Sequence, residues 1–301
     1  MTTLAGPLAD ARTAAASRRD LLMLARPRLA AMGLLTVVLT YAIASPSTGD
    51  WYRVAHLVVG SLLTLAGASV LNQLAERRVD GLMRRTANRP LPAGRMRPRN
   101  ALVYGVVLAT LGLVLLAVAV NGLTAWSAAA GLGAYILLYT PLKRRTSLAT
   151  VVGAVPGAAP VLMGWSAATG SLGIEAWVLF GTLFLWQLTH FLAIGWMYRT
   201  DYLRAGFRML PAVDPEGAAT ARQAVVYGLA LIPVSLGPSA LGLAGPVYFV
   251  GALALGAAYL AAGIGLARHR TGASAARLLR ASVLYLPLLL SLLLIDRGVP
   301  R

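Results

Sequence analysis

A row of oxygen-bearing side chains ends one of the apolar stretches of this sequence. Asn72, Glu76 and Asp80 recur at intervals of four residues, a spacing that places them along one side of a helix. Their oxygens suit a hard cation such as Mg²⁺, which commonly takes one or two carboxylates and completes its shell with water and substrate phosphates. The row therefore predicts a Mg²⁺ site.

Basic side chains follow this row and suit a phosphate group, because guanidinium groups match phosphate oxygens bidentately. Acids and bases interleaved in this way are what a metal-bound diphosphate would need. The cations in question lie in two loops and are Arg84, Arg85, Arg89, Lys143 and Arg144. Another interpretation stays open, in which the acids only form ion pairs at a solvated helix end, where a pair contributes about 0–1 kcal/mol.

Membrane-spanning helices must position these side chains. Only 12% of the residues are charged and 58% are hydrophobic, whereas a soluble domain carries roughly 25% charged residues. Apolar runs close to the bilayer-crossing length of roughly 20 residues recur along the chain. The sequence predicts an all-α membrane bundle of nine transmembrane helices, at residues 29–45, 54–75, 101–120, 123–140, 148–167, 174–196, 224–241, 247–266 and 281–295.

The basic residues sort to one side of this predicted bundle. With nine spans, only Arg53, Arg297 and Arg301 fall on the other side, so the positive-inside rule predicts a cytoplasmic N-terminus and an external C-terminus. The net charge of +17 is then explained by topology and anionic lipid, and not by nucleic acid. Residues 1–20 are expected to form a flexible cytoplasmic tail, and residues 21–301 a single domain.

The ten carboxylates narrow the functional classes. None lies at mid-bilayer depth, which disfavours an ion-coupled transporter with a buried proton relay. The absence of cysteine excludes disulfides and thiolate metal sites. His190 lies inside the sixth predicted span, where a histidine is more often a hydrogen-bonded bundle residue than a ligand. Asp201, at the rim after that span, can face the first acid row if the spans pack around one cavity.

Several segments together form a family pattern. They are Asn72…Glu76…Asp80…Met83-Arg84-Arg85-Thr86…Arg89-Pro90-Leu91…Gly94, then Tyr139-Thr140…Leu142-Lys143-Arg144, then Gly153…Pro156-Gly157-Ala158…Pro160, then Trp186-Gln187…His190-Phe191…Asp201-Tyr202…Met209-Leu210-Pro211, and Ser282…Tyr285-Leu286. This pattern resembles the protoheme IX farnesyltransferase (heme O synthase) family, within the UbiA superfamily of intramembrane prenyltransferases. The resemblance covers roughly residues 20–296.

The resemblance implies an activity and a set of site residues. A prenyltransferase of this type moves a farnesyl group from farnesyl diphosphate to a vinyl group of heme B, forming heme O and releasing diphosphate. It implies Mg²⁺ as the cofactor, heme B as a substrate, a prokaryotic cell (inner) membrane with the active site on the cytoplasmic side, and a heme A synthase or oxidase assembly partner. The implied metal ligands are Asn72, Glu76, Asp80 and Asp201, and the implied substrate-binding residues are Thr86, Trp186, Gln187, His190, Asp201 and Tyr202.

Departures from the family pattern leave some points open. Thr200 replaces an acid before Asp201, so the number of Mg²⁺ ions, one or two, is not decided. A prenyltransferase with a quinone precursor or another tetrapyrrole as acceptor stays open, although the His190 span and the segment at 209–211 favour heme. A non-catalytic heme-binding or transport membrane protein is the alternative from a different class.

Overall fold

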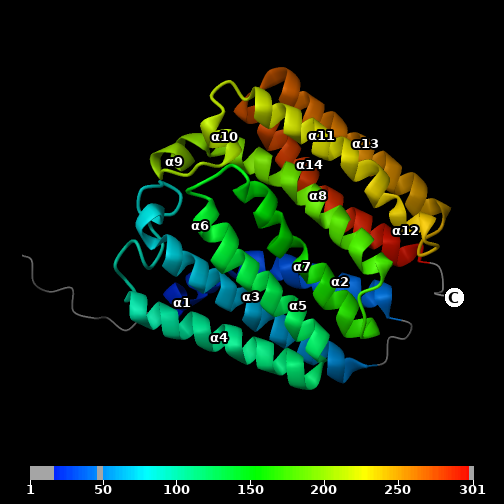
Figure 1. Ribbon diagram of the computed structural model, residues 1–301, viewed down its shortest axis with the longest axis horizontal. Coiled ribbons are helices and arrows are strands. Elements are labelled where there is room, and N and C mark those ends of the chain that lie inside the picture. Colours follow the sequence, from blue (N-terminus) through cyan, green and yellow to red (C-terminus); the bar gives the residue numbers. More distant parts are fainter. Residues whose placement is uncertain (1–16, 46–49, 298–301) are drawn as a thin grey trace, which may run out of the picture.

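The computed structural model describes residues 17–45 and 50–297, which are helical with short connections (Figure 1). Apart from one isolated bridge between Ala244 and Arg297, these residues form no strand pairing. The elements in chain order are α1 (Arg18–Ala25), α2 (Pro27–Ala44), α3 (Trp51–Asp80), α4 (Pro98–Ala119), α5 (Gly122–Gly133), the π-helix η1 (Ala134–Tyr139), α6 (Thr140–Leu142), α7 (Ala149–Thr169), α8 (Ile174–Met197), α9 (Arg199–Arg204), α10 (Leu210–Val213), α11 (Ala218–Ser235), α12 (Gly237–Ala240), α13 (Pro246–His269) and α14 (Gly272–Ile295).

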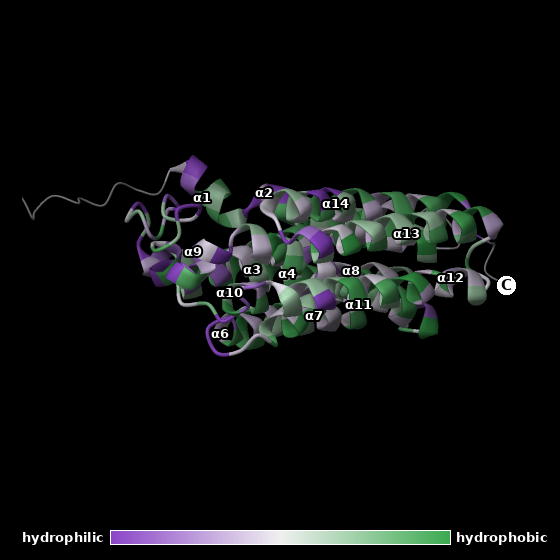
Figure 2. Cartoon of the chain, turned by 90° about the horizontal axis from the view of Figure 1, so that it is seen from above, coloured by the Kyte–Doolittle hydropathy of each residue, from purple (hydrophilic) through white to green (hydrophobic). Residues whose placement is uncertain are grey.

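The predicted membrane bundle is confirmed within this described part of the chain. Nine helical segments there are long and apolar enough to cross a membrane. Large apolar side chains such as Val118, which is 83% exposed, face outward, where lipid would contact them. Hydrophilic residues gather at the end of the bundle that carries α1, α6, α9 and α10 (Figure 2).

Two helices extend beyond the predicted membrane spans, α3 at its C-terminal end and α14 at its N-terminal end. α3 continues to Asp80, so the Asn72–Asp80 row extends the apolar span as one helix of 30 residues, as expected. α14 begins at Gly272 and not at residue 281, because Thr271 and Ser274 form a reciprocal capping box. Hydropathy missed this start because the first turns of α14 carry Arg277 and Arg280.

The helix α1 begins where a flexible tail was predicted to end. Residues 1–16 of that predicted tail lie outside the described residues. The Ser17 hydroxyl caps α1 by accepting a hydrogen bond from the Asp20 backbone N–H at 3.1 Å. Arg95 Nε donates to Asp20 Oδ1 at 2.9 Å, and this bond lowers the pKa of the carboxyl. Helix α1 therefore starts two residues before the predicted boundary at residue 20.

Small residues let the long helices approach each other closely. A Cβ atom on Gly67 of α3 would lie 2.6 Å from the Ala109 backbone nitrogen of α4, and one on Gly112 would lie 2.4 Å from Thr64 Oγ1. Without a hydrophobic driving force between helices in lipid, such backbone contact supplies much of the association energy. The pairing of α3 with α4 therefore depends on glycine at these crossings.

We expect Gly67→Ala to destabilise the bundle, although alanine is the better helix former. Overpacking typically costs about 1–3 kcal/mol, which outweighs the roughly 1 kcal/mol that alanine contributes in a helix interior. Gly265→Ala in α13 is the matched control, since a Cβ there meets nothing within 4 Å. Thermal unfolding in detergent should show a lower Tm for Gly67→Ala only; equal shifts for the two variants would contradict the close-approach explanation.

Helix α8 packs against α7, α11 and α14 (Figure 1). Two helical segments of the bundle, α7 and η1, are irregular. Pro156 and Pro160 lie inside α7, where each removes a backbone donor. The π-helix η1 lies just before α6, and π segments frequently occur at functional sites. Both irregular segments contribute side chains to the same cavity.

Candidate active site

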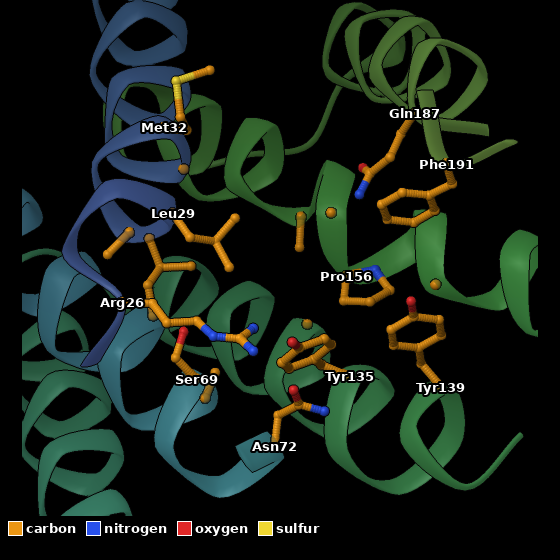
Figure 3. Close-up of a pocket in the computed structure, with 18 of the residues that line it drawn as sticks. Arg26, Leu29, Met32, Ser69, Asn72, Tyr135, Tyr139, Pro156, Gln187 and Phe191 are labelled. Carbon is orange, nitrogen blue, oxygen red and sulfur yellow. The ribbon is translucent and has the colours of Figure 1, made fainter. Parts of the chain in front are cut away.

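The cavity to which these helices contribute has a volume of about 620 Å³. That volume lies within the range of about 300–1,000 Å³ typical of ligand pockets. Residues of α2, α3, α5, η1, α7, α8 and α14 line it, as Figure 3 shows for part of its wall. One part is polar, and the rest is apolar and includes small residues such as Gly33, Ala68, Ala128, Gly131 and Ala159.

The predicted acid row lies at the polar part of this cavity. Asn72, Glu76 and Asp80 all line it, on the last turns of α3. Asn72 and Asp80 are each only 1% exposed, and Glu76 is 8% exposed. The row is therefore inside the fold, and not on the solvated helix end that the alternative interpretation required.

Each carboxylate of the row forms a short ion pair with a cation from another segment. Lys143 Nζ lies 2.6 Å from Glu76 Oε1, and Arg89 Nη1 lies 2.6 Å from Asp80 Oδ2. Lys143 also lies 4.2 Å from the centre of the Tyr139 ring. All four charged side chains line the cavity, so the pairs are part of its wall.

The free oxygens of the row fit a divalent cation. Asp80 Oδ1 is buried and accepts no hydrogen bond within the described residues. Thr140 donates its one hydroxyl hydrogen to the Tyr135 carbonyl oxygen at 2.7 Å, so Thr140 Oγ1 accepts from Asn72 Nδ2 at 3.0 Å. The Asn72 amide oxygen is thereby left for the cavity, beside two carboxylates, and this donor set matches Mg²⁺ preferences.

Arg26 is a cavity residue that the sequence analysis missed. It occupies a left-handed conformation with φ of 48° between α1 and α2, and its guanidinium points into the cavity in Figure 3. Burial, and next the positive charge of Arg26, lower the pKa of Arg89. In the sequence, Arg26 could have been singled out because it directly precedes Pro27, the first residue of a membrane span.

The docking of α1 places Arg26. Leu24 is fully buried against the loop after α3, and Gln73 Nε2 donates to the Leu24 carbonyl oxygen at 2.6 Å. With the Asp20–Arg95 pair, these contacts hold both ends of α1 on the bundle. The turn at Arg26 then directs its side chain toward the acid row.

Other predicted site residues are divided between the cavity and its surroundings. Arg85 and Tyr202 line the cavity, and Arg85 lies 5.0 Å from the Tyr198 ring centre. Thr86 is buried and donates to the Asp80 carbonyl oxygen at 2.7 Å, so it closes the end of α3 and does not line the cavity. Arg84 is exposed and lies outside the lining.

Like Arg84, Asp201 and Arg144 lie outside the lining of the cavity. Asp201 lies outside the cavity lining and is 3.5 Å from Arg204. Within residues 17–45 and 50–297, no group of three or more His, Cys, Asp or Glu side chains could hold one metal ion. Arg144 belongs to a separate shallow depression with Arg145 and Arg208. The sequence pattern gave no sign of this division, because it depends on how the loops fold over the rim.

The sixth span supplies the opposite wall, where Trp186, Gln187 and His190 all line the cavity. A Cβ on Gly157 of α7 would lie 1.9 Å from Gln187 Oε1, so the glycine makes room for this amide. Gln187 Oε1 is buried without a hydrogen-bond partner in the described chain. His190 Nδ1 lies 2.7 Å from Ser282 Oγ of α14.

Comparison with known proteins shows the family of this chain. Residues 33–289 match the UbiA prenyltransferase family. The chain belongs to that family. It is 47% identical over 288 residues to a protoheme IX farnesyltransferase of Solibacter usitatus (strain Ellin6076), covering 93% of this chain and 99% of that one. It is 45% identical over 277 residues to a protein of the same name from Salinibacter ruber, covering 92% and 98%. The predicted family resemblance is confirmed.

Solved structures of the UbiA family share the fold. A digeranylgeranylglyceryl phosphate synthase in membranes superposes with a TM-score of 0.77 at 17% identity, covering 92% of this chain and 97% of that one. A UbiA homolog from Archaeoglobus fulgidus bound to GPP and Mg²⁺ gives a TM-score of 0.68 at 15% identity, covering 91% and 99%. This chain is thus a membrane prenyltransferase with the UbiA architecture.

Proposed function

We propose that this prenyltransferase transfers a farnesyl group from farnesyl diphosphate to a vinyl group of heme B, forming heme O and releasing diphosphate. The observation that carries the proposal is the meeting of the Asn72–Asp80 row with Arg89 and Lys143 at one part of a largely apolar cavity. The name of the Solibacter and Salinibacter relatives, protoheme IX farnesyltransferase, supports the choice of donor and acceptor.

Asn72, Glu76 and Asp80 would hold Mg²⁺, since all three line the cavity and Asp80 Oδ1 has no hydrogen-bond partner in the described chain. When bound, Mg²⁺ would neutralise charge on the diphosphate oxygens. The Archaeoglobus homolog with GPP and Mg²⁺ supports a metal in this fold. Asp201 stays a proposed ligand only if its loop moves toward the row.

The side chains around the row would bind the leaving group. Arg89, Lys143 and Arg26 place positive charge where the diphosphate oxygens gain charge as the carbon–oxygen bond breaks, and such electrostatic stabilisation is usually the largest catalytic contribution. The diphosphate departs with the bonding electron pair. Arg85 can contact the same group, whereas Arg84 and Arg144 can do so only from outside the cavity lining.

The apolar part of the cavity would hold the farnesyl chain and exclude water from the allylic cation. A heme vinyl carbon attacks that cation and forms the new carbon–carbon bond. Water then adds to the resulting carbocation and loses a proton, which completes the hydroxyethyl group. Trp186, Gln187 and His190 form the wall available for the heme, with His190 as an iron ligand or a propionate partner. Tyr202 and Thr86 support the rim.

Synergistic binding of Mg²⁺ and pyrophosphate follows from the two ion pairs. In the structure Lys143 and Arg89 form ion pairs with Glu76 and Asp80, and a diphosphate would give both cations new partners. We expect inorganic pyrophosphate to tighten Mg²⁺ binding by about 10- to 100-fold, and Mg²⁺ to tighten pyrophosphate binding by the same factor. Calorimetry on purified protein, corrected for the complex formed in solution, measures both factors. Equal Mg²⁺ affinity with and without pyrophosphate would contradict the exchange of partners.

We further propose that residues 21–301 act as one domain in a prokaryotic cell (inner) membrane, with the N-terminus and active site cytoplasmic and the C-terminus external. Hydrophilic residues gather at the end of the bundle that carries α1, α6, α9 and α10 (Figure 2), and the basic residues of the loops at residues 77–99 and 143–145 support a cytoplasmic side there. A heme A synthase or oxidase assembly partner would receive the product.

Mass spectrometry of heme from cells tests the function directly. The chain is expressed in a host whose own heme O synthesis has been deleted, and the extracted heme is expected to gain the mass of a hydroxyethylfarnesyl group. Purified protein is then incubated with labelled farnesyl diphosphate and either heme B or a quinone precursor. If only the quinone precursor becomes labelled, the quinone precursor and not heme B is the acceptor. If no acceptor becomes labelled, the result favours a non-catalytic heme-binding or transport role.

A further inference from the structure

His190 is held by Ser282 of α14 and by Trp186 of its own helix, α8. Its Nδ1 lies 2.7 Å from Ser282 Oγ, and its ring stacks on Trp186 with centroids 5.1 Å apart and planes at 23°. Trp186 Nε1 donates to the Ser282 backbone oxygen at 2.8 Å. Tyr259 of α13 donates to the Trp186 carbonyl oxygen at 3.1 Å. The imidazole is therefore fixed in orientation as well as in position.

The hydrogen bonds of Ser282 decide which imidazole nitrogen carries the proton. The Ser282 hydroxyl donates to the Leu279 carbonyl oxygen at 2.6 Å. A hydroxyl has one hydrogen, so Ser282 Oγ acts as an acceptor toward His190. Nδ1 must then carry a hydrogen, and in a neutral ring Nε2 keeps its lone pair.

The second nitrogen is open to the cavity. Within residues 17–45 and 50–297, Nε2 of His190 has no hydrogen-bond partner. The atom is also not buried. His190 itself lines the cavity. The unprotonated nitrogen therefore faces the space in which a substrate would lie.

We propose that Ser282 is a positioning residue that holds His190 in the Nδ1–H form, so that Nε2 presents a lone pair to the cavity. A lone pair in this position takes a transition-metal centre or a hydrogen-bond donor, and a fixed outer partner is what raises the basicity of a ligating imidazole. Identification of that centre as the iron of heme rests on the proposed function. The assignment of the Nδ1–H tautomer does not depend on that function.

Nitrogen NMR tests the tautomer without any ligand. The chain has three histidines, so protein labelled with ¹⁵N-histidine in detergent gives few signals, and His190→Gln assigns the relevant pair. We expect wild-type His190 to show a protonated Nδ1 and an unprotonated Nε2. A protonated Nε2, in the other tautomer or in an imidazolium, would overturn the proposal.

Variants test whether Ser282 is the cause. Ser282→Ala should leave His190 as a mixture of tautomers, and Ser282→Thr, which keeps a hydroxyl, should restore the Nδ1–H form. Ser61→Ala is the matched control, since Ser61 is also fully buried, lies on α3 away from the cavity lining, and has an unpaired hydroxyl. An unchanged Nδ1–H signal in Ser282→Ala would overturn the positioning role.

Titration with heme B separates this inference from the proposed function. Loss of an outer partner typically costs about 10- to 100-fold in metal affinity, and we expect Ser282→Ala to weaken heme binding by that factor with a changed Soret band. If both Ser282→Ala and His190→Ala bind heme as the wild type does, the heme assignment of His190 fails. The NMR result then still decides the tautomer.

Discussion

Asp80→Asn is expected to lower kcat/KM for farnesyl diphosphate by about 10³-fold, because it removes a carboxylate of the proposed Mg²⁺ site and so weakens the metal's stabilisation of the leaving group. Asp80 is 1% exposed, and within the described chain its Oδ1 is a buried carboxylate oxygen without a hydrogen-bond partner. The asparagine keeps the shape but offers only one weaker oxygen to a metal. Turnover of labelled farnesyl diphosphate at saturating Mg²⁺ measures the effect.

Controls separate chemistry from folding in that experiment. Asp80→Asn leaves the guanidinium of Arg89 buried without its counter-charge, a change that can cost about 3 kcal/mol of stability. The double variant Asp80→Asn/Arg89→Gln should recover much of the lost Tm but none of the activity. Asp50→Asn, at the opposite end of α3, keeps an N-cap residue and should be fully active. Full turnover by Asp80→Asn would remove the metal assignment.

Lys143→Gln is expected to lower kcat/KM by about 10²-fold, with most of the loss in KM for farnesyl diphosphate. Lys143 is 8% exposed and lies between Glu76 and the Tyr139 ring, so its charge acts in a partly desolvated site, where electrostatic interactions are stronger than in water. The same variant frees Glu76, and binding of Mg²⁺ alone should become tighter. Initial rates and calorimetry measure the two opposite changes.

Arg145→Gln provides the matched control for Lys143. Arg145 lies two residues along the same loop, is exposed, and belongs to the separate depression with Arg208. If general positive charge at the rim attracts the diphosphate, the two variants should lose similar activity. If the cavity position matters, as we expect, only Lys143→Gln should raise KM and alter Mg²⁺ binding.

Two kinds of site information were within reach of sequence reasoning. The four-residue spacing of Asn72, Glu76 and Asp80 needs only the geometry of one helix, and the structure confirms that α3 carries all three on its last turns. The basic segment that follows α3 is close to this row in the sequence, so its proximity in space could also be predicted. Arg85 and Arg89 line the cavity, whereas Arg84, directly before Arg85 in the same segment, does not.

Contacts between distant segments were beyond that reasoning. The partner of Glu76 is Lys143, 67 residues away, and the partner of His190 is Ser282, 92 residues away. Arg26 reaches the cavity only because α1 docks on Gln73 and the loop after α3. Asp201, expected beside the row, turns to Arg204 instead.

By itself the sequence determined the all-α membrane bundle, its nine spans and its family, because apolar length and helical periodicity are local properties that the bilayer forces into helices. Only the tertiary structure decided which cations pair with Glu76 and Asp80, that Arg26 joins them, and which nitrogen of His190 is open. These choices depend on the register in which helices pack, and that register is set by close contacts such as Gly67 against Ala109, which spacing along the chain does not encode.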